Sequence, residues 1–146
     1  MGGMVDISAK KDVLRIAVAR GRIKLKRETI LRIRDNRIEK GNVIEATKII
    51  IMNAVKRTAQ ILPFCHPIEI THIDPKISIS DDFVEVEVTV KSFAKTGVEM
   101  EALMGVSIGL LNIWDMVKKY EKDEAGQYPY TKISDIIVVK KQKGER

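Results

Sequence analysis

The segment from residue 84 to residue 90 reads VEVEVTV, a strict alternation of apolar and polar side chains. Successive side chains of a β-strand point to opposite faces, so this pattern predicts a strand with one buried face. Asp81 and Asp82 precede it, and an apolar, β-branched segment lies before them. We therefore expect two adjacent strands, Ile68 to Ser80 and Phe83 to Phe93, joined at the two aspartates.

The residues before these strands predict one more strand and two helices. Arg15 to Leu25 is rich in β-branched and alternating apolar residues, which indicates a strand with a bulge at Gly21. Lys26 to Arg34 is expected to form a short helix. Asn42 is expected to cap a second helix that continues to Pro63, because proline interrupts helical hydrogen bonding.

The longest apolar run begins at Val98 and ends at about Tyr120, and it predicts one long helix. Thr96 is a good N-cap residue and Glu99 follows three residues later, so we expect a capping box at this start. A last strand is expected in ISDIIVVKK, residues 133–141. The basic tail, residues 140–146, is expected to be loose.

The predicted order is strand, helices, strand, strand, helix, strand. This is the split βαβ order of a ferredoxin-like α+β sandwich, an antiparallel sheet with helices packed on one face. The chain has 146 residues, of which 45% are hydrophobic. That length suits one domain, so we expect residues 1–146 to form a single unit.

Charge and cysteine content narrow the classes of function. The net charge of +6 predicts a surface that attracts anions, which include the phosphates of small molecules and of nucleic acids. One cysteine excludes an intramolecular disulfide, and no signal peptide is visible, so we expect a soluble cytoplasmic protein without membrane contact. Cys65, His66 and His72 are too few soft ligands for a closed zinc site, so no metal is expected.

Acidic residues on the long helix are candidates for chemistry. Glu99 and Glu101 are two residues apart, about 200° around a helix, so they cannot share one face. Glu101 and Asp115 lie within about 40° of each other but roughly 21 Å apart along the axis. One compact site cannot hold both, so either the ligand is long or a second subunit contributes. Asp115 and Lys118 share a face, as catalytic partners or as an ordinary surface ion pair.

Two further segments carry polar chemistry. In LPFCHP, residues 62–67, two prolines fix the backbone around Phe64, Cys65 and His66, which places an imidazole and a thiol at a rigid corner. The histidine has equally a structural interpretation, and covalent catalysis by the thiol is the weaker use. Lys40 directly precedes the cap of the second helix, where the helix dipole disfavours a cation, which suggests anion binding or proton transfer.

Five ordered segments together resemble one known family. They are MVDIS from Met4, KGNV from Lys40, AVKRTAQILPFCHP from Ala54, KTGVEMEAL from Lys95 and IWDMVKKYEKD from Ile113. Taken in this order, they closely resemble the cyclic pyranopterin monophosphate synthase (MoaC) family of molybdenum cofactor biosynthesis, over nearly the whole chain. The resemblance implies a ferredoxin-like fold and a homohexamer, a trimer of dimers with active sites at the dimer interface.

The resemblance also implies a reaction. Family members rearrange a cyclised dihydro-GTP to cyclic pyranopterin monophosphate and release diphosphate, as phosphorus-oxygen lyases. Such chemistry needs general acids and bases and cations that hold a triphosphate. No cofactor is expected, and a divalent cation with the diphosphate is compatible with this reaction.

The site residues implied by the resemblance form two overlapping sets. The catalytic set is Lys40, His66, Glu99, Glu101, Asp115 and Lys118, and the substrate-binding set is Phe64, Cys65, His66, Met100, Glu101, Lys91 and Lys140. Asp115 and Lys118 are expected to transfer protons, Lys40 to act as a second acid or base, and His66 to face the phosphates. Lysine stands at position 91, where many relatives are expected to have arginine, and lysine binds phosphate as a point charge.

Two other classes of function compete with this one. A basic ferredoxin-like domain could bind RNA, but VEVEVTV has acids where stacking aromatic residues would be needed. A non-catalytic assembly subunit with the same fold is the third class, and the presence of every candidate catalytic side chain argues against it. We therefore expect a small-molecule substrate and no nucleic-acid partner.

Overall fold

Strand β3 (Phe83–Ala94) contains the alternating segment, and its side chains divide between two faces as predicted. Four of them are fully buried in the core against the helices: Val84, Val86, Val88 and Val90. The polar residues that alternate with them lie on the opposite face of the sheet. The pattern in sequence thus determines which face of the sheet receives the helices.

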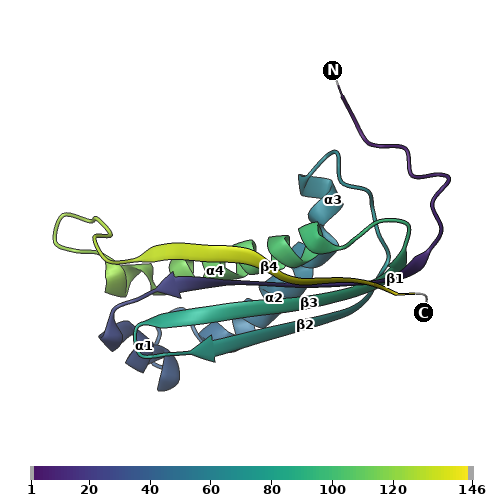
Figure 1. Cartoon of the computed structure of the whole chain (residues 1–146). Helices are drawn as coiled ribbons and strands as arrows, with labels where there is room; N and C mark the ends of the chain where they lie inside the picture. The colour runs from purple at the N-terminus through teal and green to yellow at the C-terminus, as the bar shows by residue number, and fades with distance from the viewer. Residues whose placement is uncertain (1, 145–146) are drawn as a thin grey trace.

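The structure is a computed structural model that describes residues 2–144. Three strands join β3 in one sheet: β1 (Val13–Lys24), β2 (Ile70–Ile79) and β4 (Lys132–Gly144). The strand order is β2, β3, β1, β4, and all neighbours are antiparallel (Figure 1). This arrangement confirms the predicted ferredoxin-like α+β sandwich.

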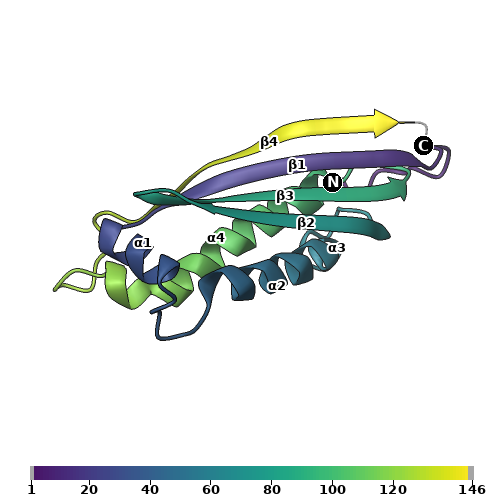
Figure 2. The same ribbon diagram turned by 90° about the horizontal axis from the view of Figure 1, so that it is seen from below.

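Helices α1 (Arg27–Arg34), α2 (Val43–Lys56) and α4 (Glu99–Glu121) cover one face of the sheet (Figure 2). The short helix α3 (Thr58–Ile61) follows α2. Helix α4 is the centre of the helical layer, because it packs against α2 and against strands β1, β3 and β4. Within residues 2–144, no helix lies on the other face of the sheet (Figure 2).

Two glycines let α2 and α4 approach closely. A Cβ atom at Gly105 would lie 2.9 Å from a methyl group of Val55, and one at Gly109 would lie 2.9 Å from Ile51. Real Cβ atoms do not come so close to other carbons, so only glycine fits at these positions without a shift of the Val55 or Ile51 side chain. The glycines therefore set the spacing of the helical layer.

The predicted second helix is divided in two, which corrects its expected extent to Pro63. Helix α2 ends at Lys56, and Arg57 is its C-cap. The hydroxyl group of Thr58 donates to the carbonyl oxygens of Ala54 and Val55, at 3.1 and 2.9 Å. Such a bond competes with the backbone amides for those carbonyls and favours a break.

The predicted capping box at the start of α4 is wrong. The N-cap residue is Val98, and no side chain caps it. The carboxylate of Glu99 instead forms an ion pair with Lys141 of β4, at 3.0 Å. The Glu99 carboxylate therefore pairs with a distant strand and not with the backbone at the start of its own helix.

The expectation of a loose tail is also wrong for residues 140–144, which belong to β4 and pair with β1 as far as Leu14. Residues 145 and 146 lie outside the described part of the chain. The register of β1 against β4 shifts between Arg20 and Arg22, with the extra residue in β4, where Asp135 has φ = +59°. The irregularity predicted at Gly21 therefore lies opposite that glycine.

Among the described residues, α4 is the only helix long and apolar enough to cross a membrane by length and composition. Half of its apolar stretch is buried inside the protein, where α4 packs between α2 and the sheet. The core helix of a soluble protein has the same length and composition, so this feature is weak evidence for a membrane span.

Candidate active site

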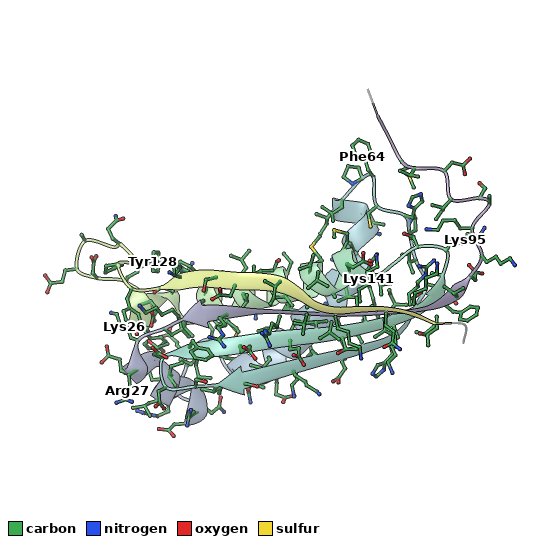
Figure 3. All side chains as sticks on the ribbon, in the orientation of Figure 1. Lys26, Arg27, Phe64, Lys95, Tyr128 and Lys141 are labelled. Carbon is green, nitrogen blue, oxygen red and sulfur yellow. The ribbon has the colours of Figure 1, made fainter. Side chains whose placement is uncertain are left out.

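Most of the predicted site residues lie in two groups at opposite ends of α4. Glu99 and Glu101 are in its first turn, whereas Asp115 and Lys118 are near its last turn. Fourteen residues at 1.5 Å each separate Glu101 from Asp115 by roughly 21 Å. Figure 3 shows one end of the molecule around Phe64 and Lys141 and the far end around Tyr128.

At the far end, Lys40, Asp115 and Lys118 form what we call the lysine-aspartate cluster. Lys40 Nζ donates to Asp115 Oδ2 and to the Asp115 backbone oxygen, each at 3.1 Å. Lys118 Nζ lies 3.4 Å from Asp115 Oδ1. All three side chains are about half exposed, so a ligand can reach them.

The two lysines determine the charge state of Asp115. The hydrogen bond from Lys40, the positive charge of Lys40 and then that of Lys118 hold the pKa of this carboxyl group below its ordinary value. Asp115 is therefore ionised at neutral pH and can accept a proton, while the ammonium groups can donate one. The cluster has the composition of an acid and base centre.

Lys40 reaches Asp115 because the loop before α2, residues 35–42, has a defined path. Ile38 is buried in the core, two residues before Lys40. Gly41 has φ = +120°, a conformation that other residues rarely adopt. The side chain of Asn42 accepts a hydrogen bond from the Glu45 amide at 3.0 Å, which confirms the predicted cap of α2.

At the near end lies a cavity of about 580 Å³, which we call the LPFCHP cavity. Leu62, Pro63, Phe64, Cys65 and His66 line it from the loop after α3. It is also lined by Met100 and Glu99 of α4, and by the N-terminal segment. The structure thus brings together most of the predicted binding residues, in a largely apolar pocket of the size that holds a ring system.

Glu101 is a buried acid next to this cavity. It is 3% exposed, and its Oε2 atom lies 3.8 Å from the thiol of Cys65. Within the described residues its Oε1 atom has no hydrogen-bond partner. Burial raises the pKa of Glu101, and burial together with Glu101 raises the pKa of the Cys65 thiol. Each group therefore keeps its proton to a higher pH than it would in water, which makes Cys65 a poor nucleophile.

Glu99 differs from Glu101 because it has a cationic partner. Burial by itself would raise the pKa of Glu99. The hydrogen bond from Lys141, a hydrogen bond from its own backbone amide and the charge of Lys141 act against burial, and the pKa lies below its ordinary value. The buried Arg15 contributes in the same direction. The guanidinium group of Arg15 also donates to the backbone oxygens of Ala94 and Lys95, at 3.2 and 3.1 Å, and so fixes the turn before α4.

His66 holds the N-terminal segment over the cavity. Its Nε2 atom lies 2.6 Å from the carbonyl oxygen of Val5. A carbonyl oxygen only accepts, so Nε2 carries the proton in this contact. The N-terminal segment therefore forms one wall of the LPFCHP cavity, to which Val5, Ile7 and Lys10 contribute.

Two predicted binding residues point elsewhere. Lys91 alternates with the buried valines of β3, so it lies on the face of the sheet away from the helices. Lys140 pairs with Val18 and shares that outer face, whereas Lys141 pairs with the buried Ala17 and faces the helices. The structure therefore brings Lys141, and not Lys140, to Glu99.

Sequence reasoning missed a basic cavity beside the first one. Its volume is about 320 Å³, and its lining includes Lys10, Lys11, Arg15 and Lys143. Lys10 lines both cavities. The signal in sequence was the density of cations around residues 10–15 and 140–143, but only the pairing of β1 with β4 shows that they meet.

No group of three or more His, Cys, Asp or Glu side chains within residues 2–144 is placed to hold a metal ion. The predicted soft ligands are separated: Cys65 and His66 lie in the loop after α3, and His72 lies in β2. Among the described residues, the carboxylate that lines the LPFCHP cavity is Glu99, which is paired with Lys141, and the buried Glu101 lies next to it. The expectation that no metal is required stays a prediction.

Comparison with known proteins gives a consistent result. A family model described as the MoaC family matches residues 4–144. A probable cyclic pyranopterin monophosphate synthase of Pyrococcus furiosus is 57% identical over 98% of this chain and 92% of that protein. One of Saccharolobus solfataricus is 56% identical over 96% and 94%. A Methanothermobacter thermautotrophicus relative, 52% identical over 97% and 89%, is named as a probable accessory protein of this synthase.

Proposed function

This chain belongs to the MoaC family of molybdenum cofactor biosynthesis, and we propose that it is a cyclic pyranopterin monophosphate synthase. The proposed substrate is a cyclised dihydro-GTP. The proposed products are cyclic pyranopterin monophosphate and diphosphate. Because a phosphorus-oxygen bond breaks as the cyclic phosphate forms and diphosphate leaves, the enzyme would be a phosphorus-oxygen lyase.

The observation that carries this proposal is the lysine-aspartate cluster. Opening a purine ring and closing a pterin ring are sequences of proton transfers, which need an ionised base and charged acids within reach of one ring. Asp115 supplies the base, because Lys40 and Lys118 keep it ionised. Each lysine, at 3.1 to 3.4 Å from the carboxylate, is placed to return a proton.

The near end supplies binding and a second set of acids. The apolar walls of the LPFCHP cavity, including Phe64 and Met100, suit a flat ring, and Glu101 with its raised pKa can donate a proton there. The cations at this end, among them Lys10 and Lys141, suit a polyphosphate. We keep His66 and Glu99 in the proposed catalytic set, with His66 toward the phosphates.

We further propose that each active site combines the two ends of α4 from different subunits. The distance of roughly 21 Å within one chain exceeds the reach of one rearranging ring. The surface between the two ends carries exposed apolar side chains: Leu111 on α4, and Ile136 and Val138 on the helix-facing side of the outer strand β4. Leu111 and Asp115 share one face of α4 because they are four residues apart. A second copy of this chain, related by a two-fold axis, would cover this surface.

The assembly is proposed as a homohexamer, a trimer of such dimers, in the cytoplasm. The proposed partner is the small-molecule substrate, with no nucleic acid and no membrane. No cofactor is proposed, although a divalent cation with the diphosphate group is compatible with the site. Lys91 and Lys140 lie on the outer face of the sheet, so any phosphate contact from them would have to be made across a subunit boundary.

The test is turnover of the cyclised dihydro-GTP by the purified protein. We expect pterin product and diphosphate in equal amounts, measured by chromatography and by a pyrophosphatase-coupled phosphate assay. Asp115→Asn is the matched control, because it keeps the shape of the side chain and removes the base. Substrate that stays unchanged with the wild-type protein, or product formed equally by Asp115→Asn, would contradict the proposal.

A further inference from the structure

The residue before Lys40 is tied to the helix that carries Asp115. The backbone amide of Glu39 donates a hydrogen bond to the hydroxyl oxygen of Tyr120, at 2.9 Å. The carboxylate of Glu39 also forms an ion pair with Lys119. Tyr120 and Lys119 lie in the last turn of α4, one turn beyond Asp115. The C-terminal end of α4 thus carries Asp115 and also contacts the backbone next to Lys40.

The ring of Tyr120 is a rigid support for that contact. It is partly buried against the hydrophobic core. The guanidinium group of Arg32, on α1, lies over the ring at 4.7 Å from its centroid. The ring is therefore held between core and cation, and its hydroxyl group has little freedom to follow a moving loop.

The Lys40 side chain cannot fix the loop by itself. It is about half exposed, and among the described residues its ammonium group bonds only to Asp115, which is also about half exposed. An exposed ion pair of this kind contributes little and is screened by salt. The position of Lys40 must come from its backbone. On one side the Gly41 amide donates to the Ile38 carbonyl oxygen at 3.0 Å. The contacts that tie this turn to the rest of the domain are Ile38 in the core and the Glu39 amide on Tyr120.

We propose that Tyr120 is a positioning residue for Lys40: its hydroxyl group holds the Glu39 amide and thereby keeps the Lys40 ammonium group on Asp115. For turnover this inference rests on the proposed function, because Lys40 is assigned there to proton transfer. The geometry itself does not depend on the reaction. Glu39 and Lys119 strengthen the contact less, since both side chains are largely exposed.

The test removes only the hydroxyl group, with Tyr120→Phe, which keeps the ring under Arg32. Tyr130→Phe is the matched control: Tyr130 lies under Lys24, and its hydroxyl group has no hydrogen bond to other described residues. The Glu39 amide is at an exposed residue, so water replaces the lost acceptor and the melting temperature should change little.

Three measurements follow. Hydrogen exchange of residues 36–42 should become about fivefold faster in Tyr120→Phe, the factor that corresponds to one hydrogen bond. The pKa of Asp115, followed by NMR of its side chain, should rise toward its ordinary value, because Lys40 contributes most to lowering it and Lys118 remains. With turnover, kcat should fall about two- to fivefold while KM stays unchanged. Tyr130→Phe should match wild type in all three.

The outcomes separate this inference from the proposed function. A wild-type protein without turnover would overturn the function, and exchange and the Asp115 titration would still test the role of Tyr120. If Tyr120→Phe leaves exchange of residues 36–42 and the Asp115 titration as in wild type, the positioning role is refuted. If both change while kcat stays at the wild-type value, the link from Tyr120 to catalysis is refuted.

Discussion

The proposed composite active site predicts complementation between two inactive chains. Glu101→Gln removes the proposed acid at the near end of α4 and keeps its shape. Asp115→Ala removes the proposed base at the far end. If each site takes Glu101 from one subunit and Asp115 from the other, a dimer of one chain of each kind has one site with both lesions and one site with neither.

The size of the recovery follows from this geometry. When equal amounts of the two chains combine at random, about half of the dimers are mixed, and one of the two sites in each mixed dimer is intact. The mixture should therefore reach about one quarter of wild-type activity per site. Recovery is expected because Glu101 and Asp115 are roughly 21 Å apart along one helix, too far for one chain to supply both to a single site.

The assay is turnover after co-expression of two differently tagged chains and purification through both tags. This selects mixed assemblies and raises the expected recovery. The matched control pairs Asp115→Ala with Lys118→Ala. These lesions lie 3.4 Å apart in wild type and within one chain, so every site of a mixed dimer carries one of them and no activity should return. Verified mixed assemblies of Glu101→Gln and Asp115→Ala without any recovery would refute the composite site.

Three further predictions concern single residues. Lys118→Ala should lower kcat by about 10² to 10⁴ with an unchanged melting temperature, because a positioned acid or base contributes that factor and its side chain is half exposed; near wild-type kcat would leave it a surface ion pair. Glu121→Ala should lower the free energy of unfolding, measured in urea, by about 3 kcal/mol. The buried carboxylate accepts hydrogen bonds from the Lys26 amide and from the hydroxyl groups of Thr29 and Thr131, and all three donors would lose their acceptor. A loss below about 1 kcal/mol would contradict this. Glu101→Gln should gain stability relative to wild type as pH rises, because glutamine does not titrate. In wild type, native Glu101 keeps its proton above the ordinary glutamate pKa, whereas the unfolded chain loses it. The free energy of unfolding of wild type therefore falls between the ordinary pKa and the raised one, by about 1.4 kcal/mol for each pH unit that separates them. Parallel stability curves between pH 4 and pH 8 would exclude a raised pKa for Glu101.

The fold was predictable because its signals are local. The alternation around Val86 identifies a half-buried strand, and the cap at Asn42 and the breaker at Pro63 mark ends of helical structure without knowledge of their neighbours. The break at Arg57 was missed although its signal, a threonine at position 58 that bonds to the preceding turn, is local as well. Threonine side chains inside helices often make this bond without ending the helix, so the signal is weak.

The errors at Thr96 and in the tail have a common cause, which is pairing between distant segments. Lys141 draws the Glu99 carboxylate away from a capping role, and it can do so only because the lysine-rich tail is a strand. Lysines in a terminal segment indicate a solvated tail, yet an outer strand also tolerates them, since one of its edges faces solvent. Neither segment by itself contains a sequence pattern that predicts the pairing of residues near Leu14 with Gly144.

That pairing also constrains how the protein folds while it is being synthesised. Strand β1 leaves the ribosome before β2, β3 and β4, and it lies inside the sheet, between β3 and β4. One edge of β1 is satisfied when β3 emerges, but the other waits for β4, which follows the long helix α4. Until then a twelve-residue strand keeps open backbone donors and acceptors, the kind of edge that promotes association between nascent chains. Deletion of the last residues of β4 should therefore lower the soluble yield much more than the stability of any protein that does fold.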